Sequence, residues 1–228
     1  MTFQELQTRL NISLPDDILQ EALTHRSILN DKTQRNTKHN ERLEFLGDAV
    51  LELITSDYFY KKYSDKTEGE LTNYRSAVVN RTYLASIAKE LGIGKAMILS
   101  HGERSSGGED KPYLLANALE AILGAIYITS GMPAAVQFVH TYVLSKEEEL
   151  ITMGYHIDAK TTFQELSQAD LRITPHYEVM KEEGLDHDKT FTVGAFVGDK
   201  QVGTGIGNSK KTAQMAAAED ALIHRSDW

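Results

Sequence analysis

The hydrophobic pattern changes near residue 150, and this change requires two parts that fold differently. Up to about Leu150, apolar residues recur three and four positions apart, which is the spacing of amphipathic helices. Beyond Asp158 the pattern predicts a helix, three short strands and a second helix, over residues 161–170, 176–181, 191–197, 201–206 and 208–224. The predicted fold class is an all-α N-terminal domain followed by an α+β domain with the order α-β-β-β-α.

The junction between these two parts is short. We place the first domain at residues 1–150, a short linker at 151–157 and the second domain at 158–228. The junction passes from a charged helix end through Gly154 without low-complexity sequence, which favours a modest hinge over a long flexible tether.

Composition excludes several classes of site. The 228 residues include no cysteine, so a disulfide scaffold, a thiolate metal site and a cysteine nucleophile are all excluded. The N-terminus lacks the basic start and apolar stretch of a signal peptide. The most apolar segment, residues 113–128, falls short of the ~20 residues that span a bilayer. We therefore expect a cytoplasmic protein without membrane contact.

The formal net charge of −9 is a poor indicator of nucleic-acid binding when it is taken alone. Proteins that bind phosphates usually carry a basic surface. Local charge patterns, or a metal ion that turns acidic residues into a phosphate site, must therefore decide the question.

One predicted helix carries a stripe of carboxylates. Glu41, Glu44 and Asp48 share one face, and the apolar residues Leu43, Leu46, Val50 and Leu53 share the opposite face. On spacing alone, a solvated surface and a cation-binding face are equally good interpretations. Like charges at these spacings repel, and no lysine or arginine occurs between residues 43 and 60 to offset them, which favours a bound cation.

A second carboxylate, Glu120, lies within the apolar segment 113–128, on the same predicted face as Asn117 and Gly124. Burial of an unpaired carboxylate costs several kcal/mol, so Glu120 needs a partner. The structural alternative is an ion pair with Arg26 or Arg75, and the functional one is a divalent metal shared with the acidic helix. Oxygen ligands without cysteine favour Mg²⁺ or Mn²⁺ over zinc.

Two lysines begin the last predicted helix. Lys210 and Lys211 oppose the helix dipole there, so they are poor choices for stability and good choices for docking a phosphate. Gln164 and His187 are candidate neutral donors. We find no strand with paired exposed aromatic residues for stacking single-stranded bases, so recognition of duplex RNA by shape fits better.

Over essentially its whole length the sequence resembles bacterial ribonuclease III. The motifs are NERLEFLGDAV at residues 40–50, ALTHRS at 22–27, EGEL at 68–71 and LANALEA at 115–121. Residues 158–224 resemble a double-stranded-RNA-binding domain, marked by GLDHDKTF at 184–191 and GIGNSKKTA at 205–213. The resemblance implies a homodimeric, Mg²⁺-dependent endonuclease, with Mn²⁺ as a substitute metal. Such an enzyme cuts double-stranded RNA in ribosomal and messenger RNA processing, leaving 5′-phosphate and 3′-hydroxyl ends with short 3′ overhangs.

The resemblance also assigns residues, of which Asp48 and Glu120 are the catalytic pair. It implies metal binding by Glu44, Asp48, Asn117 and Glu120, and accessory positions near the cleft at Glu41 and Glu68. It implies RNA contacts at Thr161, Gln164, His187, Ser209, Lys210 and Lys211. Phe45 matches an aromatic residue that inserts into the partner subunit, although spacing alone predicts a core residue. No nucleotide cofactor is expected, because the glycine-rich loop at residues 100–108 lacks the ending of a phosphate-binding loop.

Asn117 departs from the family pattern, in which an aspartate is usual three residues before the second-helix glutamate. We expect activity with weaker metal affinity. The alternatives are a non-catalytic double-stranded-RNA-binding regulator, in which Asn117 marks a decayed metal site, and an acidic helical scaffold with an attached α/β module.

Overall fold

Two glycines bring the two longest helices of the protein into direct contact. These helices are α3 (Glu41–Lys62) and α7 (Pro112–Tyr142). A Cβ atom on Gly47 would collide with the backbone carbonyl of Glu120, and one on Gly124 would collide with that of Leu43. Backbone against backbone is the closest packing two helices can adopt, and it sets the residues of one helix directly opposite those of the other.

The computed structural model describes residues 1–30, 34, 36–152, 159–184 and 189–225. The chain forms two units, Met1–His156 and Ile157–Trp228. The predicted linker, 151–157, begins inside the last helix of the first unit, and its remaining residues lie outside the described ones. The exact domain bounds therefore stay a prediction.

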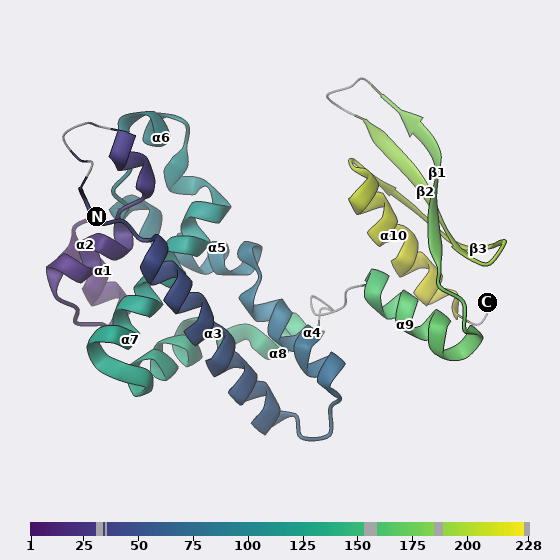
Figure 1. The fold of residues 1–228 in the computed structure, drawn as a ribbon, viewed down its shortest axis with the longest axis horizontal. Coiled ribbons are helices and arrows are strands. Elements are labelled where there is room, and N and C mark those ends of the chain that lie inside the picture. The colour runs from purple at the N-terminus through teal and green to yellow at the C-terminus, as the bar shows by residue number, and fades with distance from the viewer. Residues whose placement is uncertain (31–33, 35, 153–158, 185–188, 226–228) are drawn as a thin grey trace. The chain divides into compact units, whose positions relative to one another are not determined.

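The first unit is helical, as expected (Figure 1). Besides α3 and α7, its α-helices are α1 (Phe3–Leu10), α2 (Asp16–Leu23), α4 (Glu68–Val79), α5 (Arg81–Glu90), α6 (His101–Ser105) and α8 (Glu147–Thr152). Short 3₁₀ turns cover Arg26–Asn30, Ile93–Ala96, Gly108–Asp110 and Leu144–Lys146.

Helix α7 is the core helix of this unit. Leu115, Ala118 and Ile122 are buried together with residues on its other faces, as its all-round apolar sequence predicts. The helical stretch Pro112–Thr152 is long and apolar enough to cross a membrane by length and composition alone. The helix that contains the apolar segment 113–128 continues to Tyr142, past a kink at Gly131, where φ is 77°.

The second unit has the predicted order, α9 (Ala159–Leu171), β1 (His176–Glu183), β2 (Thr190–Val197), β3 (Lys200–Gly207) and α10 (Lys210–Ile223). The antiparallel sheet has the order β1-β2-β3, and both helices pack on one of its faces (Figure 1). The buried core includes Phe163, Val193 and Ala195 together with an alanine ridge of α10, formed by Ala213, Ala217 and Ala221. The ridge can lie close because β3 presents Gly203 and Gly205 to it.

The opposite face of the sheet carries an aromatic stack that the sequence analysis missed. The rings of His176 on β1 and Phe196 on β2 stack with their centroids 5.2 Å apart. These residues are partners in the strand register, so they share a face of the sheet. This pair spans two strands and only His176 is exposed, so it differs from the paired exposed aromatic residues on one strand that the sequence lacks.

Candidate active site

The carboxylates of α3 and α7 line one cavity of about 630 Å³. Glu41, Glu44 and Asp48 reach it from α3, and Asn117 and Glu120 reach it from α7. The glycine contact explains this meeting, because the carbonyl that touches Gly47 belongs to Glu120, and Gly47 directly precedes Asp48. The structure thus brings together the residues expected to hold a metal.

The electrostatics of the cavity oppose full ionisation of its acids. Burial, with the nearby charges of Asp48 and Glu44, raises the pKa of Glu120 to about 7. Burial, followed by the charge of Glu41, also raises the pKa of Glu44, while a side-chain interaction with Asn117 lowers it. Carboxylates held close together with raised pKa values favour a bound cation.

The two arginines offered as structural partners for Glu120 are engaged elsewhere. Arg26 pairs with Glu41 at 3.0 Å, and Arg75 pairs with Glu52 at 2.7 Å. Neither forms an ion pair with Glu120 in the part of the chain that the structure describes, so the structural alternative loses its named partners.

The donor chemistry fits a hard divalent cation, since carboxylate and amide oxygens are the ligands that Mg²⁺ prefers. No three His, Asp or Glu side chains among the described residues converge into a ready-made metal cluster, however. The ligand set Glu44, Asp48, Asn117 and Glu120 therefore stays a prediction.

Arg81 is a cavity residue that the sequence analysis missed. It is the first residue of α5, after the N-cap Asn80, and it lowers the pKa of both Glu44 and Glu120. Nothing in the local sequence around residue 81 resembles a site, because only the packing of α5 on α7 brings this arginine to the acids.

Other predicted residues lie at or beyond the edge of the cavity. Glu68 is the first residue of α4 and is not among the residues that line it. Phe45 lines the cavity and is 79% exposed, so the spacing-based prediction of a core residue was wrong. Leu43 and Val50 are buried as expected, but Leu53, predicted on the same apolar face, is 58% exposed. Helix α3 thus has an exposed apolar side as well as a buried one.

Four of the six predicted RNA-contact residues lie on the two helices of the second unit. Thr161 and Gln164 are exposed on α9, and Lys210 and Lys211 are exposed in the first turn of α10. Ser209 is the N-cap of α10, where its hydroxyl accepts from the backbone N–H of Thr212, and His187 lies outside the described residues.

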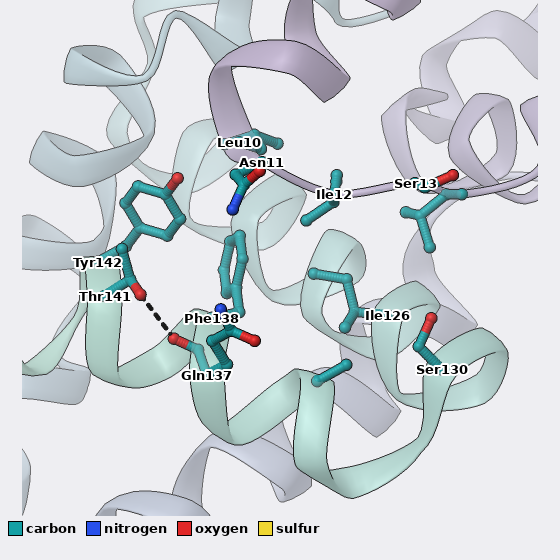
Figure 2. Close-up of a pocket in the computed structure, with 12 residues that line it drawn as sticks. Leu10, Asn11, Ile12, Ser13, Ile126, Ser130, Gln137, Phe138, Thr141 and Tyr142 are labelled. Atoms are coloured by element: carbon teal, nitrogen blue, oxygen red, sulfur yellow. Dashed lines mark hydrogen bonds between the residues drawn. The ribbon is translucent and has the colours of Figure 1, made fainter.

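A second cavity, of about 220 Å³, lies between the segment after α1 and α7 (Figure 2). Asn11 and Ile12 line one side, and Gln137 and Phe138 line another. Its lining includes no carboxylate, imidazole, lysine or arginine, so it lacks the groups for metal or acid–base chemistry.

Comparison with known proteins points to one family. A family model described as ribonuclease-III-like matches residues 15–147, and a double-stranded RNA binding motif matches residues 159–224. A protein from Desulforamulus reducens named ribonuclease 3 is 42% identical over 96% of this chain and 89% of that protein. The ribonuclease 3 of Borreliella afzelii is 45% identical over 92% of this chain and 86% of that protein.

A solved structure agrees with these matches. The nuclease domain of ribonuclease III from Campylobacter jejuni, described for flexibility in a region involved in dimer formation, is similar with a TM-score of 0.58. It is 37% identical, and the match covers 62% of this chain and 96% of that one.

Proposed function

The chain belongs to the ribonuclease III family, and we propose that the cavity between α3 and α7 is where it cleaves double-stranded RNA. It is a double-strand-specific endoribonuclease with a helical nuclease domain and a double-stranded-RNA-binding domain. The observation that carries the location of the site is the meeting of Glu44, Asp48 and Glu120 at one cavity. Its relatives favour an enzyme, and the alternatives of a non-catalytic regulator and an acidic scaffold gain no support.

Glu44, Asp48 and Glu120 are the residues that would hold the divalent metal, Mg²⁺ or in its place Mn²⁺. Such an ion supplies charge stabilisation at the phosphate and an activated water at neutral pH. Asp48 and Glu120 line the cavity from opposite helices, and the charge of Asp48 raises the pKa of Glu120, so loss of either carboxylate would remove one side of the site. Asn117 contributes an amide that orients Glu44 without adding charge.

The mouth of the cavity carries the groups that would position RNA. Arg26 is 67% exposed at its side chain and ion-paired with Glu41, so it can reach a phosphate at the rim. Glu41 holds this arginine in place, which is an accessory role. Glu68 lies outside the lining and would act only on RNA that extends beyond the cavity.

The protein would act as a homodimer in which each subunit cuts one strand. Phe45 is an exposed aromatic side chain beside the cavity, as insertion into a partner subunit requires. Two cavities related by a twofold axis match the approximate twofold symmetry of an RNA duplex. If the two strands are cut at offset positions, the products carry short 3′ overhangs, with 5′-phosphate and 3′-hydroxyl ends. We place this activity in the cytoplasm, on ribosomal and messenger RNA precursors.

In the second unit, Lys210 and Lys211 would bind the RNA backbone, together with Thr161 and Gln164. The hydrogen bond from Lys160 to Gln214, 2.8 Å long, sets the first turn of α9 beside the second turn of α10. Contacts from both helices can therefore reach one duplex.

The test uses long duplex RNA with the purified chain, with and without Mg²⁺. We expect Glu120→Gln and Asp48→Asn each to lower the cleavage rate by at least about a hundredfold while the Kd for duplex RNA stays within twofold, by analogy with the loss of other transition-state groups. Asp57→Asn, on the same helix and paired with Lys61 away from the cavity, is the matched control and should cleave normally. Normal cleavage by Glu120→Gln would show that the cavity is not the site.

A further inference from the structure

Lys210, a lysine proposed to bind RNA, already has a carboxylate partner. Its Nζ lies 3.2 Å from Oε1 of Glu182 on β1 and 5.7 Å from the ring centroid of Phe191 on β2. Both members of the ion pair are accessible, with side chains 58% and 41% exposed. A phosphate that approaches Lys210 must therefore share or displace the Glu182 carboxylate.

We infer that Glu182 sets the affinity of this protein for duplex RNA by competing with the RNA phosphate for Lys210. This inference rests on the proposed role of Lys210 in RNA binding. The competition is local, because it depends on one carboxylate that reaches across from the sheet to the start of α10.

A β-bulge turns Glu182 toward this helix. The register of β1 on β2 pairs Val179 with Val193 and then Lys181 with Thr192, so Met180 is passed over. The extra residue shifts the following side chains of β1 to the opposite face of the sheet. Glu182 therefore lies opposite Phe191, on the same face as the buried Val193. Helix α10 packs on that face. Without the bulge, Glu182 would point to the other side of the sheet.

The other acids of β1 have partners on their own strand. Glu178 lies 3.5 Å from His176, and Glu183 lies 2.8 Å from Lys181. Of these three glutamates, Glu182 is the one whose described ion pair is with a lysine proposed to contact RNA. Glu178 therefore provides a control with the same charge, on the same strand, that leaves Lys210 paired.

The charge balance of this unit makes one lysine important. Residues 157–228 contain eight lysines and arginines against twelve aspartates and glutamates. The neighbouring Lys211 is exposed and forms no ion pair with the residues that the structure describes. One of the two adjacent lysines is thus free for a phosphate, and the other is held by Glu182.

The test measures the Kd for a duplex RNA with the full chain in EDTA, so that binding is seen without cleavage. An exposed ion pair is worth little, so we expect Glu182→Gln to bind about two- to fivefold more tightly than the unsubstituted chain near 50 mM salt. The gain should shrink as salt is raised, because screening weakens the competing pair. Glu178→Gln should change Kd by clearly less, and thermal unfolding should show that both variants are folded.

A double-mutant cycle separates competition from a general charge effect. In the Lys210→Ala background, adding Glu182→Gln should change the Kd for duplex RNA no more than adding Glu178→Gln does. With Lys211→Ala, the gain from Glu182→Gln should persist. The inference would be overturned if Glu182→Gln and Glu178→Gln changed the Kd for duplex RNA equally, or if Glu182→Gln weakened binding. The role of Lys210 in RNA binding would stand in both cases. Failure of the unsubstituted chain to bind duplex RNA would overturn that role and the inference together.

Discussion

Single residues in the cavity differ chiefly in the charge they contribute. Asn117 lines the cavity with these carboxylates, interacts with Glu44 and contributes an amide where an acid of similar size would add a negative charge. Burial, together with the charges of Asp48 and Glu44, raises the pKa of Glu120 to about 7, so a further negative charge in the cavity is unfavourable unless a cation binds. The number of charges in the cavity should therefore set the metal affinity.

The change Asn117→Asp tests this dependence. A further carboxylate attracts the cation more strongly, so we expect the Mg²⁺ concentration for half-maximal cleavage to fall by roughly three- to tenfold. A titration of the cleavage rate with Mg²⁺ measures the effect, and Asn73→Asp on α4, outside the cavity lining, is the control. An unchanged or higher half-saturating concentration would contradict the prediction.

Lys62 illustrates a purely structural charge. It pairs with the carboxylate of Glu147, which is 2% exposed and also accepts hydrogen bonds from the hydroxyls of Tyr58 and Tyr63. The change Lys62→Met leaves a buried carboxylate without its cation, so the free energy of unfolding should fall by about 3–5 kcal/mol. Urea unfolding measures the loss.

Lys61 is the matched control for Lys62. Both side chains of its ion pair with Asp57 are exposed to solvent, so Lys61→Met should change the free energy of unfolding by less than about 1 kcal/mol. Adding Glu147→Gln to Lys62→Met should recover part of the loss, because the uncompensated charge is then gone. Equal losses in the two lysine variants would contradict this account.

The sequence predicts some residues of the site better than others. Glu120 could be found because its helix is apolar on every side, so a carboxylate there must face something specific. Arg81 could not be found in this way, because nothing in the sequence of its helix, α5, indicates that it lies near the carboxylates. Phe45 and Leu53 were misplaced by spacing, since periodicity identifies apolar faces without saying whether this chain or another one covers them.

At the scale of elements, the contact of α3 with α7 is the feature on which the cavity depends. The change Gly47→Ala puts a methyl group against the backbone of α7, where no flexible side chain can move aside. We expect the helices to separate, which lowers the free energy of unfolding by about 1–3 kcal/mol and reduces cleavage by more than tenfold through misplaced carboxylates.

Gly69→Ala on α4 is the control, because a Cβ atom there meets nothing within 4 Å. Its better helix propensity should leave stability unchanged or raise it by less than about 1 kcal/mol. Normal cleavage by Gly47→Ala would show that the close helix contact is not needed.

The start of α4 makes stability depend on pH. Glu70 accepts from the backbone N–H of Thr67, and this hydrogen bond, with contributions from the Thr67 hydroxyl and Lys66, lowers its pKa to about 2. A pKa below the unfolded value means stability that is present above about pH 4.5 and is lost as the pH falls toward 2. Glu70→Gln keeps the capping geometry without the titration, so unfolding measured between these pH values should show a shallower loss than in the unsubstituted chain. If the free energy of unfolding fell equally with pH in the Glu70→Gln variant and the unsubstituted chain, Glu70 would not contribute to the acid dependence.

The elements themselves were predicted well because their signals are local. Alternating apolar residues predicted the strands of the second unit, and the last helix was predicted to begin at residue 208, close to its observed N-cap Ser209. The bulge at Met180 was not predictable, since it follows from pairing with β2 rather than from the sequence of β1. Helix α7 continues past Gly131, although a glycine with a proline two residues later usually ends a helix, and its course there follows from packing rather than from local sequence.

At the scale of the whole molecule, an exposed apolar stripe runs along α3. Phe45, Leu53 and Tyr60 are 79%, 58% and 74% exposed, at spacings of eight and seven residues that keep them on one side of the helix. The stripe is roughly 22 Å long at 1.5 Å per residue. The hydrophobic periodicity of the sequence was enough to separate the two units. The exposed apolar side of α3 could be recognised only from the folded first unit, because the sequence does not show which apolar residues stay uncovered.

This stripe should hold two copies of the chain together. Leu53→Glu puts a charge in the middle of the apolar contact, so we expect the dimer dissociation constant to rise by at least about tenfold, since burying an unpaired carboxylate is costly. Sedimentation over a range of concentrations measures the change. Ile223→Glu, at a residue of α10 that is 78% exposed, is the control and should leave the oligomeric state unchanged. If each duplex needs two cavities for cutting both strands, Leu53→Glu should also lower double-strand cleavage at low protein concentration and recover it at high concentration. A Leu53→Glu chain that stays dimeric at all concentrations would show that the stripe is not the interface.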